Sequence, residues 1–149
     1  MIIDRRALLK SGAAFSGAAL LPGLSARALN QTEFDIERFV FDSRFDRAVE
    51  AARGAAAQRI PLCEVSGDLT SLWYNDLNLQ WKQRPMTLAG VTGEDALFVL
   101  ATLAPEYRMR VVRRAEAGAA AVSGPAGMQL LHLYSWVIAG NGTIIRLNA

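Results

Sequence analysis

The sequence is short of the residues on which several common kinds of functional site depend. Its 149 residues include one cysteine, Cys63, and one histidine, His132. A single cysteine excludes an intramolecular disulfide and a multi-cysteine zinc or iron–sulfur site, and a single histidine excludes a multi-histidine metal site within this chain. The common nucleotide-binding, metalloprotease and haem-attachment motifs are also missing. The sequence therefore predicts no cofactor and no metal.

Apolar runs long enough to span a membrane are missing as well. The segment from Ser11 to Leu24 is weakly apolar and shorter than the about 20 residues of a membrane-spanning helix. It follows the run Arg5-Arg6-Ala7-Leu8-Leu9-Lys10 and precedes small residues at Ala26 and Ala28. This pattern resembles the twin-arginine (Tat) export signal of bacteria, with Arg5 and Arg6 as the arginine pair and signal-peptidase cleavage after Ala28.

The resemblance implies where the protein works and how its chain is divided. Residues 1–28 are expected to leave through the action of the Tat translocase and signal peptidase, and residues 29–149 to form a single α/β domain that is periplasmic or secreted. The whole sequence has a net charge of +2. Four basic residues and one acidic residue lie in 1–28, so 12 basic and 13 acidic residues remain and the net charge becomes −1. We therefore expect neither nucleic-acid binding nor a stable membrane anchor.

Three apolar runs with β-strand character recur at similar spacing, at residues 38–41, 60–65 and 86–91. Each is followed by a residue typical of a helix N-terminus, namely Ser43, Asp68 and Thr92. The segments after these residues carry apolar stripes at helical spacing. Because strands that alternate with helices are usually parallel, the sequence predicts a three-layer α/β sandwich with a mainly parallel sheet, in the order βαβαβα.

The last third of the sequence has a different pattern. Residues 108–113 are predicted to form a fourth strand, and the small residues 115–127 a flexible loop. Residues 130–139 form a long strand candidate, and Asn141-Gly142 is a strong hairpin signal leading into residues 143–147. The C-terminus is therefore expected to add antiparallel strands at an edge of the sheet.

Polar residues follow each of the three predicted parallel strands. In an open parallel sheet, ligands bind beyond the carboxyl ends of the strands, where the helices begin. A polar pocket for an anionic or hydroxyl-bearing ligand is one hypothesis for this edge, and helix capping alone is the other. The ligand-binding candidates are Asp42, Ser43, Arg44, Glu64, Ser66, Asp68 and Thr92.

Glu64 is included because alternation along the strand places its side chain on the opposite face from Cys63 and Val65. A partly buried carboxylate would suit a general acid or base, and a structural ion pair with an arginine is the alternative. Cys63 is interpreted as a small buried hydrophobic residue, since no thiol-enzyme motif surrounds it. His132 lies in an apolar run without a nucleophile elbow, which argues against a serine hydrolase. No catalytic residue is assigned.

A second candidate surface lies near the middle of the sequence, where aromatic residues precede basic ones. Trp81 is followed by Lys82 and Arg84, and this grouping suits contact with a protein partner or an aromatic ligand. Core packing is the alternative, and it accounts equally well for Trp73.

Three functions fit these observations. The first is a small exported binding or accessory protein, serving an exported redox enzyme, because Tat substrates often carry cofactors or travel with enzymes that do. The second is a small periplasmic enzyme that uses Asp42, Glu64 or Asp68 as acid or base. The third is a structural subunit that pairs through the C-terminal hairpin edge.

Overall fold

The computed structural model describes residues 34–142. The predicted export signal, with Arg5, Arg6 and the cleavage position Ala28, lies outside the described residues, as does the expected last strand at residues 143–147. Within the described part, no helix is long and apolar enough to cross a membrane.

One mixed sheet organises the described residues. Its strands are β2 (Arg38–Asp42), β3 (Leu62–Val65), β4 (Leu88–Gly93), β5 (Met109–Gly124) and β6 (Gly127–Gly140). They lie in the order β3-β2-β4-β6-β5. Strand β2 pairs in parallel with β3 and β4, whereas β6 runs antiparallel to both β4 and β5.

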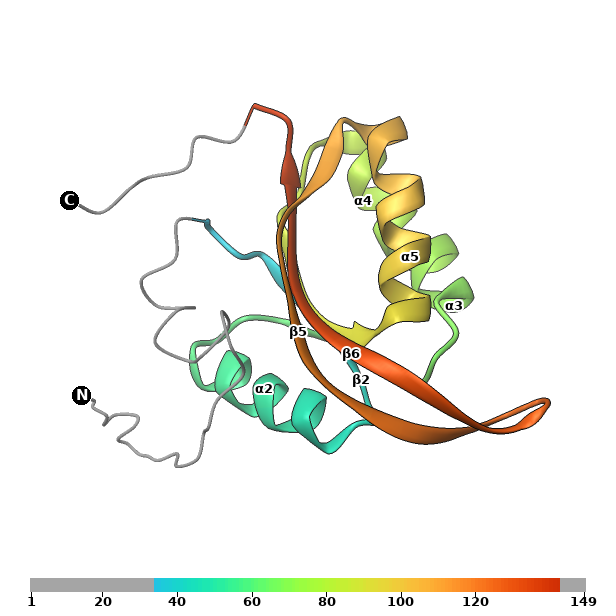
Figure 1. The fold of residues 1–149 in the computed structure, drawn as a ribbon. Helices are drawn as coiled ribbons and strands as arrows, with labels where there is room; N and C mark the ends of the chain where they lie inside the picture. The colour runs from blue at the N-terminus through green and yellow to red at the C-terminus, as the bar shows by residue number, and fades with distance from the viewer. Residues whose placement is uncertain (1–33, 143–149) are drawn as a thin grey trace.

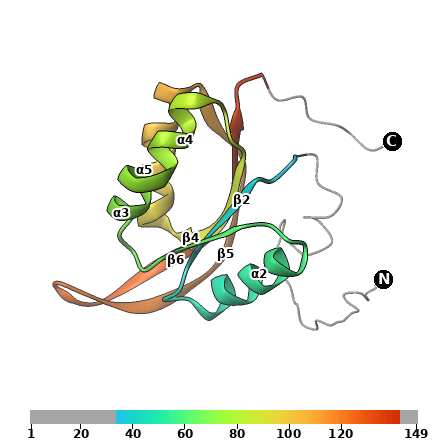
Figure 2. The same ribbon diagram turned by 180° about the vertical axis from the view of Figure 1, so that it is seen from behind.

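Helices lie on both faces of this sheet (Figures 1 and 2). On one face lies α2 (Asp46–Ala57). The other carries α5 (Glu94–Leu103) together with a helical segment formed by α3 (Thr70–Leu72), the π-helix η3 (Trp73–Leu77) and α4 (Asn78–Gln83). A short 3-10 helix, η4 (Ala104–Tyr107), leads from α5 into β5. Below, the two faces are called the α2 side and the α5 side.

Strand alternation builds a separate hydrophobic core on each side of the sheet. In β4, Ala89 and Val91 pack on the α2 side, whereas Leu88 belongs to the α5-side cluster. In β6, Val137 points to the α2 side and Trp136, which is fully buried, to the α5 side. Each large side chain buried in this way contributes about 1.5–3 kcal/mol of hydrophobic stabilisation.

The three predicted strand and helix units are confirmed, but the expected mainly parallel sheet is wrong. The sheet is mixed, and most of its pairing is antiparallel because β5 and β6 form one long hairpin. The hairpin turns at Pro125-Ala126, between the paired residues Gly124 and Gly127. Gly127 has φ +103°, a left-handed conformation that glycine adopts without steric cost.

The flexible loop expected at residues 115–127 is also wrong. Most of it continues β5, which pairs with β6 as far as Gly124. The register shifts between Val111 and Arg113 and again between Glu116 and Gly118, as at β-bulges. Small residues with weak β-propensity are therefore held in a strand by the apolar strand beside them.

Candidate functional site

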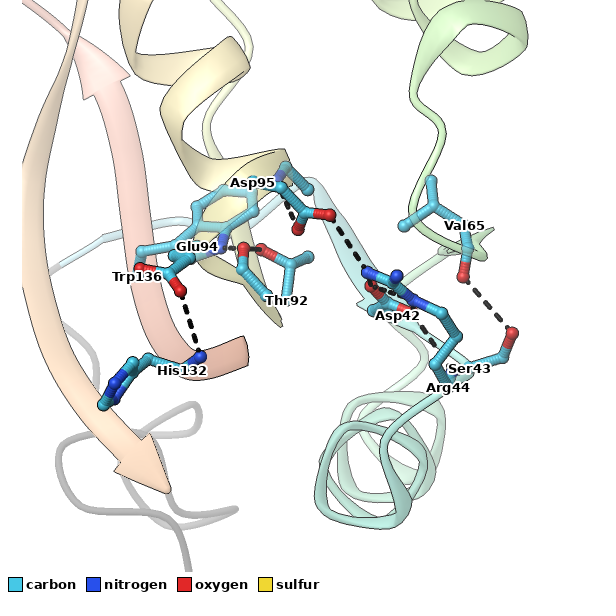
Figure 3. A network of polar contacts seen from close by, with 11 residues as sticks. Asp42, Ser43, Arg44, Val65, Thr92, Glu94, Asp95, His132 and Trp136 are labelled. Carbon is cyan, nitrogen blue, oxygen red and sulfur yellow. Dashed lines mark hydrogen bonds and ion pairs between the residues drawn. The ribbon is translucent and has the colours of Figure 1, made fainter. Parts of the chain in front are cut away.

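The candidate site at the carboxyl ends of the parallel strands is centred on an ion pair between Asp42 and Arg44 (Figure 3). Asp42 ends β2 and is completely buried. Its Oδ1 accepts hydrogen bonds from the backbone N–H and Nε of Arg44, each at 3.0 Å, and its Oδ2 accepts one from Nη2 at 2.7 Å. One arginine thus engages both oxygens of the buried carboxylate.

Arg44 has a second carboxylate partner at the first turn of α5. Nη2 also donates to Oδ2 of Asp95 at 3.2 Å, and the Asp95 side chain is 41% exposed. Hydrogen bonding to Asp42, with the charges of both carboxylates, raises the pKa of Arg44 despite the opposing effect of burial, so the guanidinium stays protonated. Asp95 was not among the predicted site residues, although an acidic residue in the first helical turn after a central strand was a signal for it.

Two glycines leave room for the Arg44 side chain. A Cβ on Gly67 would lie 2.8 Å from Cζ of Arg44, and Gly67 has φ +91°. A Cβ on Gly93 would lie 2.7 Å from Oδ1 of Asp95 and 3.5 Å from Nη2 of Arg44. The loops after β2, β3 and β4 therefore meet around one guanidinium.

The other candidates in these loops make local hydrogen bonds. Ser43 donates from Oγ to the carbonyl of Val65 at 3.3 Å, and Ser66 is exposed. Asp68 accepts a hydrogen bond from the backbone N–H of Thr70 at 2.8 Å, and contacts with Thr70 lower the pKa of Asp68. The predicted capping roles of both residues are wrong, because Phe45 and Leu69 occupy the N-cap positions of α2 and α3 and neither helix has a side-chain cap. Asp68 instead bonds the first residue of α3, and Ser43 ties two loops together.

Thr92 is buried and lies on the α5 side of the sheet. Its hydroxyl donates to the carbonyl of Gly93 at 3.1 Å and accepts a hydrogen bond from Nε1 of Trp136 at 3.0 Å (Figure 3). The expected cap of α5 is wrong, because Gly93 occupies the N-cap position and no side chain caps the helix. Thr92 satisfies the indole N–H of a buried tryptophan instead.

Glu64 is exposed, so the expectation of a partly buried carboxylate is wrong. Its strand lies at an edge of the sheet, and the α5-side face of that strand is the one that carries the buried Cys63 and Val65. Burial raises the pKa of the Cys63 thiol, although Nη1 of Arg38 lies 3.9 Å from the sulfur. The thiol is therefore protonated and unreactive near neutral pH, as predicted for a structural cysteine.

The predicted aromatic and basic surface does not form. Trp81 is 3% exposed and packs against Trp73 with ring centroids 5.8 Å apart, so its placement at the surface is wrong. Its indole N–H donates to the carbonyl of Met86 at 3.1 Å. Lys82 and Arg84 are exposed, and Arg84 forms an ion pair with Glu37. The spacing of four from Trp73 through Leu77 to Trp81, all buried, was the sequence signal for one apolar face.

His132 belongs to a different part of the surface. Its backbone N–H donates to Oε1 of Glu94 at 3.3 Å, and Nδ1 lies 2.7 Å from Oε2 of Glu116 (Figure 3 shows the first contact). The imidazole is 45% exposed. No contact joins it to Asp42 or Arg44 in the part of the chain that the structure describes, so these residues do not form a catalytic triad.

The arrangement at the strand ends is suited to holding loops together. Both oxygens of the completely buried Asp42 are engaged by Arg44, so this carboxylate serves an internal partner and is not presented to a ligand. Within residues 34–142, no group of three or more His, Cys, Asp or Glu side chains is placed to hold a metal ion. The chemistry that the geometry supports here is a buried ion pair that fixes three loops.

A different surface was not anticipated. The end of the β5–β6 hairpin projects beyond the helices in both views (Figures 1 and 2), and residues 117–131 are called the arm. On one face of the arm, Val122 and Leu131 still pack on the α2-side core. The arm contains no charged residue. Met128 and Leu130 are 69% and 66% exposed, and alternation along β6 places both on the α5 side.

Small exposed residues of β5 lie beside these two side chains. Ala121 pairs with Leu130, and Ser123 pairs with Met128. The α5 side of the arm is therefore an exposed surface of low charge, next to the Glu116 and His132 pair. No protein-family model, curated protein or solved structure matches the chain significantly.

Proposed function

We propose that this chain is a small exported protein that binds another protein and acts as an accessory subunit. Export rests on the resemblance of residues 5–28 to a Tat signal. Binding rests on one observation, the arm, which extends two strands beyond the helices and leaves Met128 and Leu130 exposed in a segment without charge. In keeping with Tat substrates as a class, the partner is an exported enzyme.

The physical chemistry of the arm supports this proposal. Covering Met128 and Leu130 on a partner would contribute about 1.5–3 kcal/mol for each side chain. Methionine adapts its shape to a partner because its side chain is unbranched and polarizable. At the base of the arm, Glu116 pairs with His132. An apolar centre with a polar border is the usual anatomy of a protein interface.

The rival hypothesis of a carboxylate enzyme gains no support from the contacts at the strand ends. Asp42 is bound on both oxygens by Arg44, Asp68 bonds the start of a helix, and Glu64 lies on an exposed strand. These three residues thus do not share one site with a free acid and a free base.

The proposal is tested with the full chain, tagged at its C-terminus and purified from the exporting cell. Native mass spectrometry of the wild type should show a stoichiometric complex with one protein of different sequence. Leu130→Asp should abolish that complex, because burying an unpaired carboxylate at an apolar contact is unfavourable. Leu79→Asp is the matched control, since Leu79 is 50% exposed on α4, away from the arm.

The complex must survive Leu79→Asp. A complex that persists with Leu130→Asp would show that the arm is not the contact surface. A wild-type protein that carries no other protein would contradict an accessory role.

A further inference from the structure

We propose that the outer edge of β5 between Gly118 and Gly124 pairs antiparallel with the same segment of a second copy of the chain. This inference goes beyond the proposed function, because it concerns the backbone edge of β5 and not the apolar face of the arm. Within residues 34–142, β5 is the last strand of the sheet, and no other described strand pairs with its outer side.

The first half of β5 is protected against such pairing. Two register shifts interrupt its regular geometry, and Nη1 of Arg47 donates to the carbonyl of Ala117 at 3.0 Å. Charged side chains also gather on this half of the strand. They are Arg110, Arg113, Arg114 and Glu116. Bulges, charges and capped carbonyls are the means by which natural proteins keep edge strands from associating.

Apart from its first residue, Gly118, beside which the Arg47 side chain lies, the second half of β5 has none of these protections. From Gly118 to Gly124 it contains no charged residue and no proline, and its register with β6 is unbroken. Its side chains are small, and Ala119, Ala121 and Ser123 are exposed. From Ala119 to Gly124, another strand can therefore approach this edge closely, without a charged side chain of β5 in the way.

The segment is complementary to itself. About a two-fold axis through Ala121, antiparallel pairing would set Gly118 opposite Gly124 and Ala119 opposite Ser123 of the second copy. No pair in this alignment brings two charges or two large side chains together. A symmetric contact in which each copy offers the same surface is the commonest form of protein dimer.

The charges of the first half exclude symmetric alignments centred there and leave those centred in the uncharged half, of which the one about Ala121 pairs the whole segment from Gly118 to Gly124. They also favour a second copy as the occupant. Alignments centred on Arg113, Arg114 or Glu116 would place like charges directly opposite each other, which is unfavourable. An alignment centred between them, on Ala115, would displace Arg47 from the carbonyl of Ala117. Only the uncharged half therefore allows symmetric pairing without opposing charges. It also has no charge pattern with which to select a different protein. The second copy carries a matching uncharged edge by construction.

The expected dimer is weak, because such a short segment buries less than the about 1,200 Å² of a standard stable interface. Dimerisation should therefore depend on protein concentration. Sedimentation equilibrium of the purified full chain, alone and over a range of concentrations, should show a reversible monomer–dimer equilibrium.

Substitution at Ala121 tests the alignment directly. Ala121→Lys and Ala121→Glu each place two like-charged side chains directly opposite each other at the axis, with Cβ atoms about 5 Å apart, and should weaken dimerisation at least about tenfold. An equimolar mixture of the two variants should regain a dimer, in which each copy supplies one sign of charge. Ala57→Lys, at an exposed position on α2, is the control and should dimerise like the wild type.

Because Ala121 is exposed, each variant is expected to fold, and circular dichroism spectra serve as the control for folding. A wild-type monomer at all concentrations overturns the inference, as does an Ala121→Lys variant that dimerises normally. A mixture that stays monomeric overturns the alignment about Ala121. Because the dimer is measured on the purified chain alone, a missing partner enzyme leaves this result unaffected and counts only against the proposed function.

Discussion

Gly90, in the middle of the central strand β4, is the position where a single added methyl group should be least tolerated. A Cβ there would lie 2.4 Å from Cζ2 of Trp136 and 2.6 Å from the backbone carbonyl oxygen of Val40. Normal contacts between such atoms are about 3.5–4.0 Å. Trp136 cannot simply rotate away, because its Nε1 is hydrogen-bonded to Thr92 and the whole side chain is buried.

The cost of Gly90→Ala follows from three contributions to the free energy of unfolding. Overpacking of a well-filled core destabilises by about 1–3 kcal/mol. Moving Trp136 lengthens its hydrogen bond to Thr92, at a cost of about 1 kcal/mol. Against these, alanine restricts the unfolded chain more than glycine does and returns about 0.4–1 kcal/mol. The net destabilisation is therefore about 1–4 kcal/mol, a large share of the 5–15 kcal/mol that stabilises a typical domain.

Urea unfolding followed by far-ultraviolet circular dichroism measures this difference. Gly124→Ala is the matched control, because the atoms nearest its added Cβ belong to the mobile end of the Gln129 side chain, at 3.1 Å. The control should change stability by less than about 0.5 kcal/mol. In a Trp136→Phe background, the cost of Gly90→Ala should fall by about 1 kcal/mol, since the two sites are in contact. A Gly90→Ala protein as stable as the wild type would refute the close packing of β4 against Trp136.

Three further substitutions, in two predictions, test the surface charges and the loops. The hydrogen bond from Arg84 lowers the pKa of Glu37, so the resulting stabilisation is present above the ordinary glutamate pKa of about 4.3 and is lost as the pH falls through the lowered value. The free energy of unfolding of Glu37→Gln should then be lower than that of the wild type at pH 7, by no more than about 1 kcal/mol, and equal to it in acid. Urea titrations at both pH values measure this difference, and a difference that stays the same in acid would contradict the prediction. Gly67→Ala should lower the free energy of unfolding by about 2 kcal/mol, because Gly67 has a left-handed backbone and its added Cβ would contact Arg44. Gly127→Ala should lower it by only about 1 kcal/mol, because Gly127 has φ +103° but no atom lies within 4 Å of its added Cβ. Equal thermal denaturation midpoints for these two glycine variants would show that Arg44 does not press on Gly67.

The strand and helix units were predictable because their signals are local. An apolar run followed by a polar helix start marks each unit, and the parallel pairing of β2 with β3 and β4 follows from the short crossovers. The second half of β5 was not predictable in this way. Alanine and glycine have weak β-propensity, and the strand forms because β6, which follows it after a tight turn, supplies an apolar partner.

The candidate site was predictable in position but not in role. Topology brings Asp42, Ser43 and Arg44 to the carboxyl ends of the strands, as expected. Sequence order does not reveal that the Arg44 side chain turns back to Asp42, nor that Thr92 contacts Trp136 across the sheet. The second contact joins neighbouring strands whose residues are 44 positions apart in the sequence. In the first, the two residues are only two positions apart, but the contact depends on the direction that the Arg44 side chain takes.

The strand ends and the arm differ in a way that bears on function. At the strand ends, the buried Asp42 meets Arg44 and the buried indole N–H of Trp136 meets Thr92, so the fold itself accounts for these polar groups. In the arm, ordering each residue costs about 1–2 kcal/mol of backbone entropy, and the exposed Met128 and Leu130 recover little of it by burial within the chain. Val122 and Leu131 pack on the α2-side core, but on the α5 side of the arm a monomer gains little stability from the exposed side chains. A partner that covers the α5 side of the arm, or a second copy paired along its edge, would supply the burial and the backbone hydrogen bonds that the isolated chain leaves unused.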